Sequence, residues 1–453
     1  MPIKRTTSLA GGGRSRMMAD HMSGKLTQTP PAERSHKRPQ QPQRVVSVDA
    51  LRGLVMFAMI FVNDLAGAGH VPAWMKHYHG PNGMTFVDMV FPAFLFIVGM
   101  SIPLAMNARL QKPHAIWGVI GHVLARTVAL LAIGIMMVNS ESDDTGPAGS
   151  KMFLSANWWR ALMFLSAILS FSTISPGRND SLEEKPPAWA RITLIARLIG
   201  ITLMVYLALT FRAPDGGHLL RLSPFFLRPL WYGILGIIGW AYLVSSLVYL
   251  IFGNHRTALL GCAVLVMSLY SAGIMGAFHK TWMAHHIDIA SALGSHPAIA
   301  VAGVLLGSIL VAPDTTSHGA RILFTTLFVA GFAAAAVLLS RQWGISKEAA
   351  TPSWALWACA MTGLLWLWLY LVSDVLNASV VLKPLATAGQ NVLLAYLLSE
   401  MMESVFSLLH IGKWYDRLAE PNLTHAIIRS AGCAVVILVV TALINRVGFR
   451  VKI

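Results

Sequence analysis

The fold is decided by two apolar stretches, GLVMFAMIFVNDLAGA (residues 53–68) and FVDMVFPAFLFIVGMSIPLAMN (residues 86–107). Each approaches or reaches the ~20 apolar residues that an α-helix needs to cross the ~30 Å hydrocarbon core of a bilayer. A surface helix of a soluble protein would present a polar face to water, and neither stretch has one. The two stretches therefore predict a pair of membrane-spanning helices joined by a polar loop.

Stretches of the same kind recur along the chain. Of its 453 residues, 55% are hydrophobic and only 12% are charged, whereas soluble domains carry about 25% charged residues. This composition excludes an ordinary soluble enzyme and predicts an all-α, polytopic transmembrane helix bundle. The twelve expected spans are 53–68, 86–107, 116–138, 158–175, 191–210, 230–252, 258–276, 297–312, 320–340, 353–374, 388–408 and 425–446.

Two of these spans are weaker than the others. The stretch 158–175 contains Arg160 near its start, and the stretch 297–312 is short. Without both of them ten spans remain, so the number of crossings stays even in either case.

Residues 1–44 differ in composition from the rest of the chain. They contain nine Lys and Arg residues against Asp20 and Glu33, among many Ser, Pro, Gln and Gly residues. Such a segment cannot bury enough apolar surface to offset its ordering entropy. We therefore expect a disordered basic tail, followed by one transmembrane domain over residues 45–453. A basic segment next to a first span indicates contact with anionic lipid, and we expect no nucleic-acid partner.

Basic residues also flank the first and last expected spans. Loops on the cytoplasmic side of a membrane are enriched in Lys and Arg close to the helix ends. This bias predicts that both termini are cytoplasmic, which agrees with an even number of crossings. The residues concerned are Arg34, Lys37, Arg38, Arg44 and Arg52 before the first span and Arg446, Arg450 and Lys452 after the last.

Several ionisable residues lie at or inside the expected spans. A charged side chain in hydrocarbon costs several kcal/mol, so it normally faces a partner or a water-filled cavity. Pairing between helices and a functional site are both open interpretations for each of them. They are Asp64, Asp88, Arg126, Arg197, Asp374, Glu400, Glu403 and Arg429.

The densest group of polar residues is the loop that joins the first two spans. Within 26 residues it contains Asn63, Asp64, His70, His77, His79, Asn82, Thr85 and Asp88. Histidine takes up and returns a proton near neutral pH, because its unperturbed pKa is about 6.5. This loop is therefore the candidate catalytic region of the chain.

Metal binding is an alternative role for the same histidines. The pair His77 and His79, and the pair His285 and His286 with Asp288 nearby, carry the side chains that bind zinc. Neither group has the spacing of a known zinc motif, so we expect no metal. The sequence also has no Walker loop and no G-x-S-x-G motif, which argues against ATPases, kinases and serine hydrolases.

The motifs in this region resemble those of a known enzyme family. The segments SVDALRGLVMFAMIFVN (residues 47–63), KH (76–77) and NGMTFVDMVFPAFLFIVGMSIPLAM (82–106) are similar to the catalytic region of the heparan-α-glucosaminide N-acetyltransferase family and its bacterial relatives. Supporting similarity is found in ISKEAATPSW (345–354), GQNVLLAYLLSEMM (389–402) and NRVGFRVKI (445–453). Enzymes of this family move an acetyl group from cytosolic acetyl-CoA across the membrane to the amine of a terminal glucosamine.

The resemblance implies roles for individual residues of the loop. Asn63 matches the family's catalytic asparagine, and His77 matches its catalytic histidine, with His79 and His70 as alternatives. We expect Asp88 or Asp64 to orient the imidazole of the histidine. The donor is expected to be acetyl-CoA, and the family suggests a homodimer.

Further residues are expected to bind the substrates. Arg126, Arg109 and Lys112 are candidates for the phosphates of coenzyme A, because guanidinium and ammonium groups pair with phosphate oxygens. Lys347 could contact the acceptor or extend to the membrane surface. The residues expected to line a polar slot for the pantetheine arm are Asn391, Tyr396 and Glu400.

The acceptor, the membrane and the reaction class follow as expectations. The animal enzymes have a long luminal domain before their first catalytic helix, and here only the basic tail precedes it, so a cell-envelope amino sugar or another amine or hydroxyl is the expected acceptor. The expected location is a bacterial inner membrane. A transporter or flippase for a small polar solute or a lipid-linked sugar is the competing class, since intramembrane acids suit proton-coupled transport. An inactive family member is a third alternative.

Overall fold

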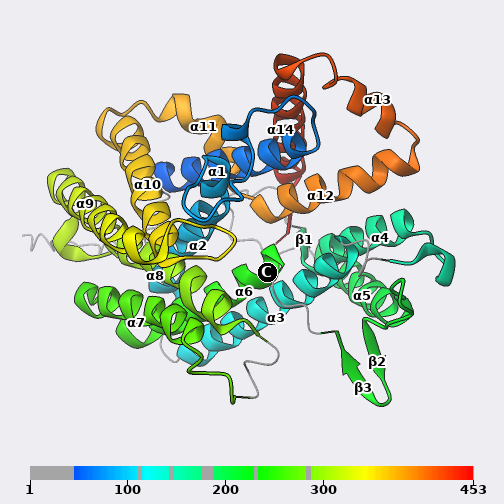
Figure 1. Ribbon diagram of the computed structural model, residues 1–453, viewed down its shortest axis with the longest axis horizontal. Coiled ribbons are helices and arrows are strands. Elements are labelled where there is room, and N and C mark those ends of the chain that lie inside the picture. Colours follow the sequence, from blue (N-terminus) through cyan, green and yellow to red (C-terminus); the bar gives the residue numbers. More distant parts are fainter. Residues whose placement is uncertain are drawn as a thin grey trace, which may run out of the picture. The chain divides into compact units, whose positions relative to one another are not determined.

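The computed structural model describes residues 45–110, 115–141, 147–174, 187–228, 233–281 and 287–451, and most of them are helical (Figure 1). The helices are α1 (Val46–Ala66), α2 (Val87–Leu110), α3 (Ala115–Glu141), α4 (Ala156–Ser170), α5 (Pro187–Thr210), α6 (Ile234–Phe252), α7 (Arg256–Ile274), α8 (His296–Ser308), α9 (His318–Trp343), α10 (Pro352–Tyr370), α11 (Ser379–Ala388), α12 (Val392–Leu408), α13 (Gly412–Arg417) and α14 (Leu423–Arg446). A π-helical segment, Ile289–Ser295, leads into α8, and another, Leu371–Val375, extends α10. The expected tail at residues 1–44 and Lys112 lie outside the described residues.

Four short strands form two antiparallel pairs. Strand β1 (Ser172–Ile174) pairs with β4 (Phe449–Val451), and β2 (Leu220–Leu222) pairs with β3 (Phe225–Leu227). The first pair joins the end of α4 to the chain that follows α14, and the second forms a hairpin between α5 and α6. The expected all-α class is confirmed, because these strands of three residues carry no layer of the fold.

Within the described segments, ten helices are long and apolar enough to cross a membrane, or eleven if the bent pair α11 and α12 counts as one span. Helix α4, with 15 residues, falls below this length, as its weaker sequence signal predicted. The expected span 297–312 does qualify, because the π-helical segment Ile289–Ser295 extends α8 to 20 residues.

Side-chain contacts define two opposite ends of the bundle. At one end, which we call the Arg52 face, the start of α1 and the end of α14 meet the same segment before α12. Arg52 Nη1 donates to the carbonyl of Gly389 (3.3 Å), and Asn445 Nδ2 donates to Gln390 Oε1 (3.3 Å). The first and last helices of the domain therefore begin and end on the same face, as an even number of crossings requires.

The other end, which we call the His77 face, contains the end of α1, the loop before α2 and the start of α14. Helices α4 and α12 connect the two faces in opposite directions. Asn157, at the start of α4, donates to Ser407 Oγ at the end of α12 (2.6 Å), while β1 after α4 pairs with β4 beside the start of α12. These two shorter helices thus also run between the two faces.

Glycines allow the backbones of α2 and α8 to approach closely at the centre of the domain. A Cβ atom added at Gly99 would overlap the carbonyl of Ala300, and one added at Gly303 would overlap the carbonyl of Phe96. Small residues serve this purpose in membranes, where helices associate through packing because lipid is as apolar as the helices. Helix α8 is almost completely buried as a result, and it supports α2, whose first turn carries the candidate site.

Candidate active site

The loop between α1 and α2 lies across the segment that joins α9 to α10. The amide of Gly83 donates to the carbonyl of Ile345 (2.8 Å), and the amide of Ile345 donates to Asn82 Oδ1 (3.0 Å). Gly344 has a φ of +65° and lies against the carbonyl of Pro81, so a side chain at position 344 would be strained and would clash. The two segments therefore hold each other over the His77 face.

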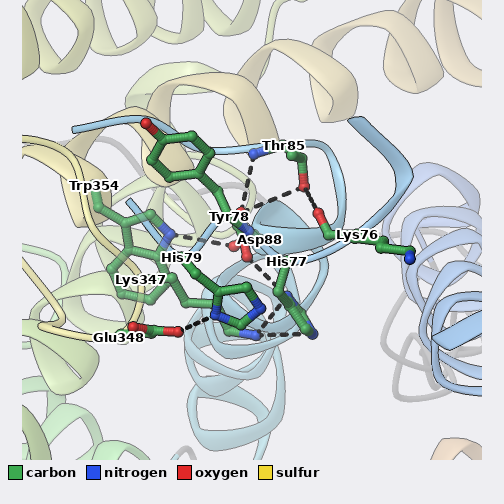
Figure 2. A network of polar contacts seen from close by, with 9 residues as sticks. All are labelled: Lys76, His77, Tyr78, His79, Thr85, Asp88, Lys347, Glu348 and Trp354. Carbon is green, nitrogen blue, oxygen red and sulfur yellow. Dashed lines mark hydrogen bonds and ion pairs between the residues drawn. The ribbon is translucent and has the colours of Figure 1, made fainter. Parts of the chain in front are cut away.

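Asp88 is the centre of the polar network in this loop (Figure 2). Its side chain is only 1% exposed, and its carboxylate accepts hydrogen bonds from the amides of Thr85 (2.9 Å) and Tyr78 (3.1 Å). The same carboxylate lies 2.8 Å from His77 Nδ1. Its backbone carbonyl accepts from the indole of Trp354 on α10 (3.2 Å). Asp88 thus fixes the loop to the start of α2, where the helix dipole also favours a negative charge.

The contact with Asp88 decides the tautomer of His77. An ionised carboxylate can only accept hydrogen bonds, so His77 Nδ1 must carry the proton. In the neutral ring Nε2 then carries the lone pair, and the His77 side chain is 39% exposed. An imidazole held in this way can accept a proton at Nε2.

Lys347 approaches the same imidazole from the segment after α9. Its Nζ atom lies 3.1 Å from His77 Nδ1 and 3.3 Å from His77 Nε2. Burial lowers the pKa of Lys347 below its ordinary value, although the charges of Asp88 and Glu348 oppose this shift. Figure 2 shows the ammonium group next to the ring of His77, whereas the side chain of Lys76 points away. Of the two interpretations of Lys347, contact with an acceptor agrees better with this position next to the candidate catalytic histidine than extension to the membrane surface does.

His79 has a different environment from His77. Its Nδ1 atom lies 2.5 Å from Glu348 Oε1, and the two side chains are 75% and 60% exposed. Exposed ion pairs contribute little, typically about 0–1 kcal/mol. The geometry therefore favours His77 over His79 as the oriented imidazole. His70 is also exposed, with a positive φ of 58°.

Asp64 does not contact the imidazole and is bound on the other side of α1. Arg429 Nη2 lies 3.1 Å from Asp64 Oδ2, and the hydroxyls of Tyr415 and Ser430 donate to the same carboxylate at 2.7 and 2.6 Å. Both charged side chains are less than a tenth exposed. Of the two carboxylates considered for orienting the imidazole, Asp88 has the contact, and Asp64 connects α1 to α14.

Asn63 lies one residue before Asp64 and contacts α12 instead. Its Nδ2 atom donates to Glu400 Oε1 (3.2 Å). Glu400 and the buried Tyr396 share one side of α12, because they are four residues apart. At the Arg52 face, Asn391 binds strand β4 through Val451 N (3.2 Å). The expected slot residues therefore follow α12 from one face to the other, and the amide of Asn391 is already engaged by the backbone of β4.

Basic side chains gather toward the Arg52 face. The guanidinium of Arg126 lies 4.4 Å above the ring of Tyr242, and its buried Nε atom has no hydrogen-bond partner among the described residues. Arg126 interacts electrostatically with Arg52, and both Arg126 and Arg109 interact with His122. Asp49 accompanies Arg52 (2.9 Å). This concentration of positive charge suits an anionic ligand.

The candidate metal ligands of the sequence lie only partly within the part of the chain that the structure describes. No group of three or more His, Cys, Asp or Glu side chains is assembled there. The carboxylate of Asp288 accepts hydrogen bonds from Ser291 (2.8 Å to the hydroxyl). His285 and His286, considered above as zinc ligands, lie outside the described residues.

Comparison with known proteins supports the family resemblance that the sequence motifs indicated. Residues 44–155 match a family described as a domain of unknown function (DUF5009). The chain is 40% identical to human heparan-alpha-glucosaminide N-acetyltransferase over 98 residues, which is 22% of this chain and 14% of the human protein. It is 30% identical to the mouse protein of the same name over 190 residues, 40% of this chain and 28% of the mouse protein. The resemblance to the N-acetyltransferase family is confirmed. The chain spans less than a third of the length of either relative.

The ion pair between Asp64 and Arg429 gives a test of stability. We expect Asp64→Asn to lower the free energy of unfolding by about 3–5 kcal/mol, because it removes the buried counter-charge of a buried guanidinium and leaves only the exposed Asp416 at 3.9 Å. The matched control is Asp314→Asn, which breaks the pair with Arg256, where the carboxylate is 65% exposed. That change should cost at most about 1 kcal/mol. Thermal unfolding of the purified protein in detergent measures both, and equal losses would contradict the structural role of Asp64.

Proposed function

We propose that the protein is a membrane-embedded acyltransferase that moves an acetyl group from cytosolic acetyl-CoA to an extracytoplasmic amino sugar or a related acceptor. The observation that carries the proposal is the contact between His77 and the buried Asp88, which places the proton on Nδ1 and the lone pair on Nε2, next to Lys347 Nζ. His77 and Asp88 lie within residues 44–155, which match the DUF5009 family, and the chain is similar to N-acetyltransferases.

The proposed chemistry needs a base and a group that polarises the thioester carbonyl. The acceptor nitrogen attacks the thioester carbon while His77 Nε2 removes its proton, and the carbon–sulfur bond then breaks to release coenzyme A. Asp88 stabilises the imidazolium that forms. The amide of Asn63 has a second N–H besides the one given to Glu400, and this group can donate to the carbonyl oxygen. An acetyl-histidine intermediate at Nε2 would use the same groups.

Lys347 is proposed to contact the acceptor and the developing negative charge. Its Nζ atom lies 3.3 Å from His77 Nε2, the atom at which the proton is transferred. A positive charge next to the oxygen of a tetrahedral intermediate lowers the barrier most when it is already in place.

The donor is proposed to approach from the Arg52 face. Arg52, Arg109 and Arg126 bring positive charge together there, and guanidinium groups pair with phosphate oxygens. The polar side chains of α12 lead from this face toward Asn63. Because both ends of the domain lie on the Arg52 face and carry basic residues, this face is proposed to be cytoplasmic, in a bacterial inner membrane.

A transporter is the second candidate function. The polar side chains along α12, from Asn391 to Glu400, favour it as well. Glu400 and Asn63 would then bind a solute in transit. The two functions differ in chemistry, since only the enzyme releases free thiol from acetyl-CoA. Binding of acetyl-CoA without release would support an inactive family member.

Substitution of the loop residues tests the proposal. With purified protein, acetyl-CoA and glucosamine, His77→Ala should lower the rate of thiol release by about 10²–10⁴-fold, since it removes the base. Asn63→Ala should lower it by about 10²–10³-fold. The matched control His79→Ala should retain most of the rate. Full activity of His77→Ala together with loss in His79→Ala would show that the assigned histidine is wrong.

The pH dependence tests the role of Lys347. A lowered pKa means that the ammonium loses its proton at a lower pH than an ordinary lysine does. The rate should therefore fall on the alkaline side below the pH of ordinary lysine titration, about 10.4. Lys347→Arg, which stays charged, should move this alkaline limb to higher pH, and Lys347→Met should be slow throughout. Each rate is corrected for the spontaneous hydrolysis of the thioester at that pH. An alkaline limb that is unchanged in Lys347→Arg would contradict a role for the positive charge of Lys347.

A further inference from the structure

An apolar cleft lies next to the His77 site. It has a volume of about 400 Å³ and is bounded by α1, α2, α10 and the end of the loop before α2. The helices α1, α2 and α10 line it with Ala58, Ala93 and Leu365, among other residues. Apart from Thr85 and Thr362, all the lining residues are apolar. Phe86 and Met361, which line it, are 40% and 45% exposed, so the cleft opens to the outer surface of the bundle.

The cleft is connected to the site through Thr85. This residue lines the cleft, and its amide and hydroxyl both contact Asp88 Oδ2, at 2.9 and 3.3 Å. Asp88 in turn holds His77. From Thr85 the cleft follows α1 through Ala58 to Leu54, away from the His77 face and toward the middle of the bilayer. A molecule that filled the cleft would have its outer end at Thr85, which is connected to the His77 ring through Asp88.

An aromatic pair stands where the cleft meets the loop. The rings of Trp74 and Phe86 have centroids 6.0 Å apart, and Trp74 is 62% exposed. Phe86 also lines the cleft, so the aromatic surface and the apolar cleft share a residue. Aromatic rings at the membrane boundary suit a molecule with one apolar and one polar part, and the C–H face of a sugar ring packs on such a surface.

We propose that the acceptor is a lipid-linked amino sugar with a single hydrocarbon chain. The chain lies in the cleft between α1, α2 and α10, and the sugar rests beside Trp74 and Phe86 with its amine near His77 Nε2. A volume of about 400 Å³ lies within the ~300–1,000 Å³ of small-molecule sites. One cleft holds one chain, which favours a single-chain lipid over a diacyl lipid. This inference rests on the proposed acyl transfer.

The cleft is expected to orient the acceptor and to add little to its binding affinity. A hydrocarbon chain that moves from the bilayer into the cleft gains no hydrophobic free energy, because lipid is as apolar as the wall of the cleft. The gain is that the amine is held at the reacting atom, which lowers the entropy cost of the reaction. The chain should therefore act through kcat/KM of the acceptor.

The test compares ethyl and dodecyl glucosaminide as acceptors in one detergent. For the unmodified protein, kcat/KM should be at least about tenfold higher with the dodecyl chain. Ala58→Phe fills the cleft and should remove most of this preference. The matched control Ala330→Phe, at an exposed position of α9, should retain it. The dodecyl compound partitions into micelles to the same extent with both variants. A difference between their preferences for the dodecyl acceptor therefore measures the effect of the cleft.

Equal preferences in Ala58→Phe and Ala330→Phe would overturn the inference, because the cleft would then hold bulk lipid only. If Ala58→Phe does not fold, Leu365→Trp fills the same cleft from α10.

Photo-crosslinking of a dodecyl glucosaminide with a diazirine at the chain end provides a readout without acetyl-CoA. Labelling near Met361 that Ala58→Phe abolishes would support the chain site even in the absence of transfer, in which case only the proposed function would fail. Transfer to both acceptors without preference or labelling would leave the enzyme and reject the chain site.

Discussion

The hydrogen bonding of one buried carboxylate organises the His77 face. Asp88 is 1% exposed at the first turn of α2, and a charge in that position is stable only if its oxygens are bound. The amides of Tyr78 and Thr85 and the ring of His77 supply these bonds, so the need of Asp88 for partners determines where the loop lies. The candidate base is thereby oriented by the same interaction that closes the loop over the bundle.

The helices were predictable from hydropathy, because a span must be long and apolar wherever it lies. Helix α11 (Ser379–Ala388) was not expected, since ten residues with Pro384 at position six are too short for that signal. Strand β1 was hidden within the expected span 158–175, which in the structure ends as a helix at Ser170. Three-residue strands carry no periodicity, and β1 pairs with a segment almost 280 positions away, so no local pattern reveals it.

The candidate site was predictable as a loop and only partly as a network. Polar density in the first loop pointed to His77 and Asp88, but the choice between Asp88 and Asp64 depends on Arg429, which lies 365 positions from Asp64. The contact of Lys347 with His77 spans 270 positions. In the sequence, Lys347 stood out only as part of the motif ISKEAATPSW (residues 345–354). Pairing between distant polar groups depends on how helices pack, and this information is not local in the sequence.

Transfer of an acetyl group through the bundle is the central claim, and sealed proteoliposomes test it most directly. Glucosamine is enclosed inside, labelled acetyl-CoA is added outside only, and the acetylated sugar is measured in each compartment. The account predicts product inside the vesicles with the unmodified protein and none with His77→Ala. Product formed only when glucosamine is present on the same side as acetyl-CoA would contradict it.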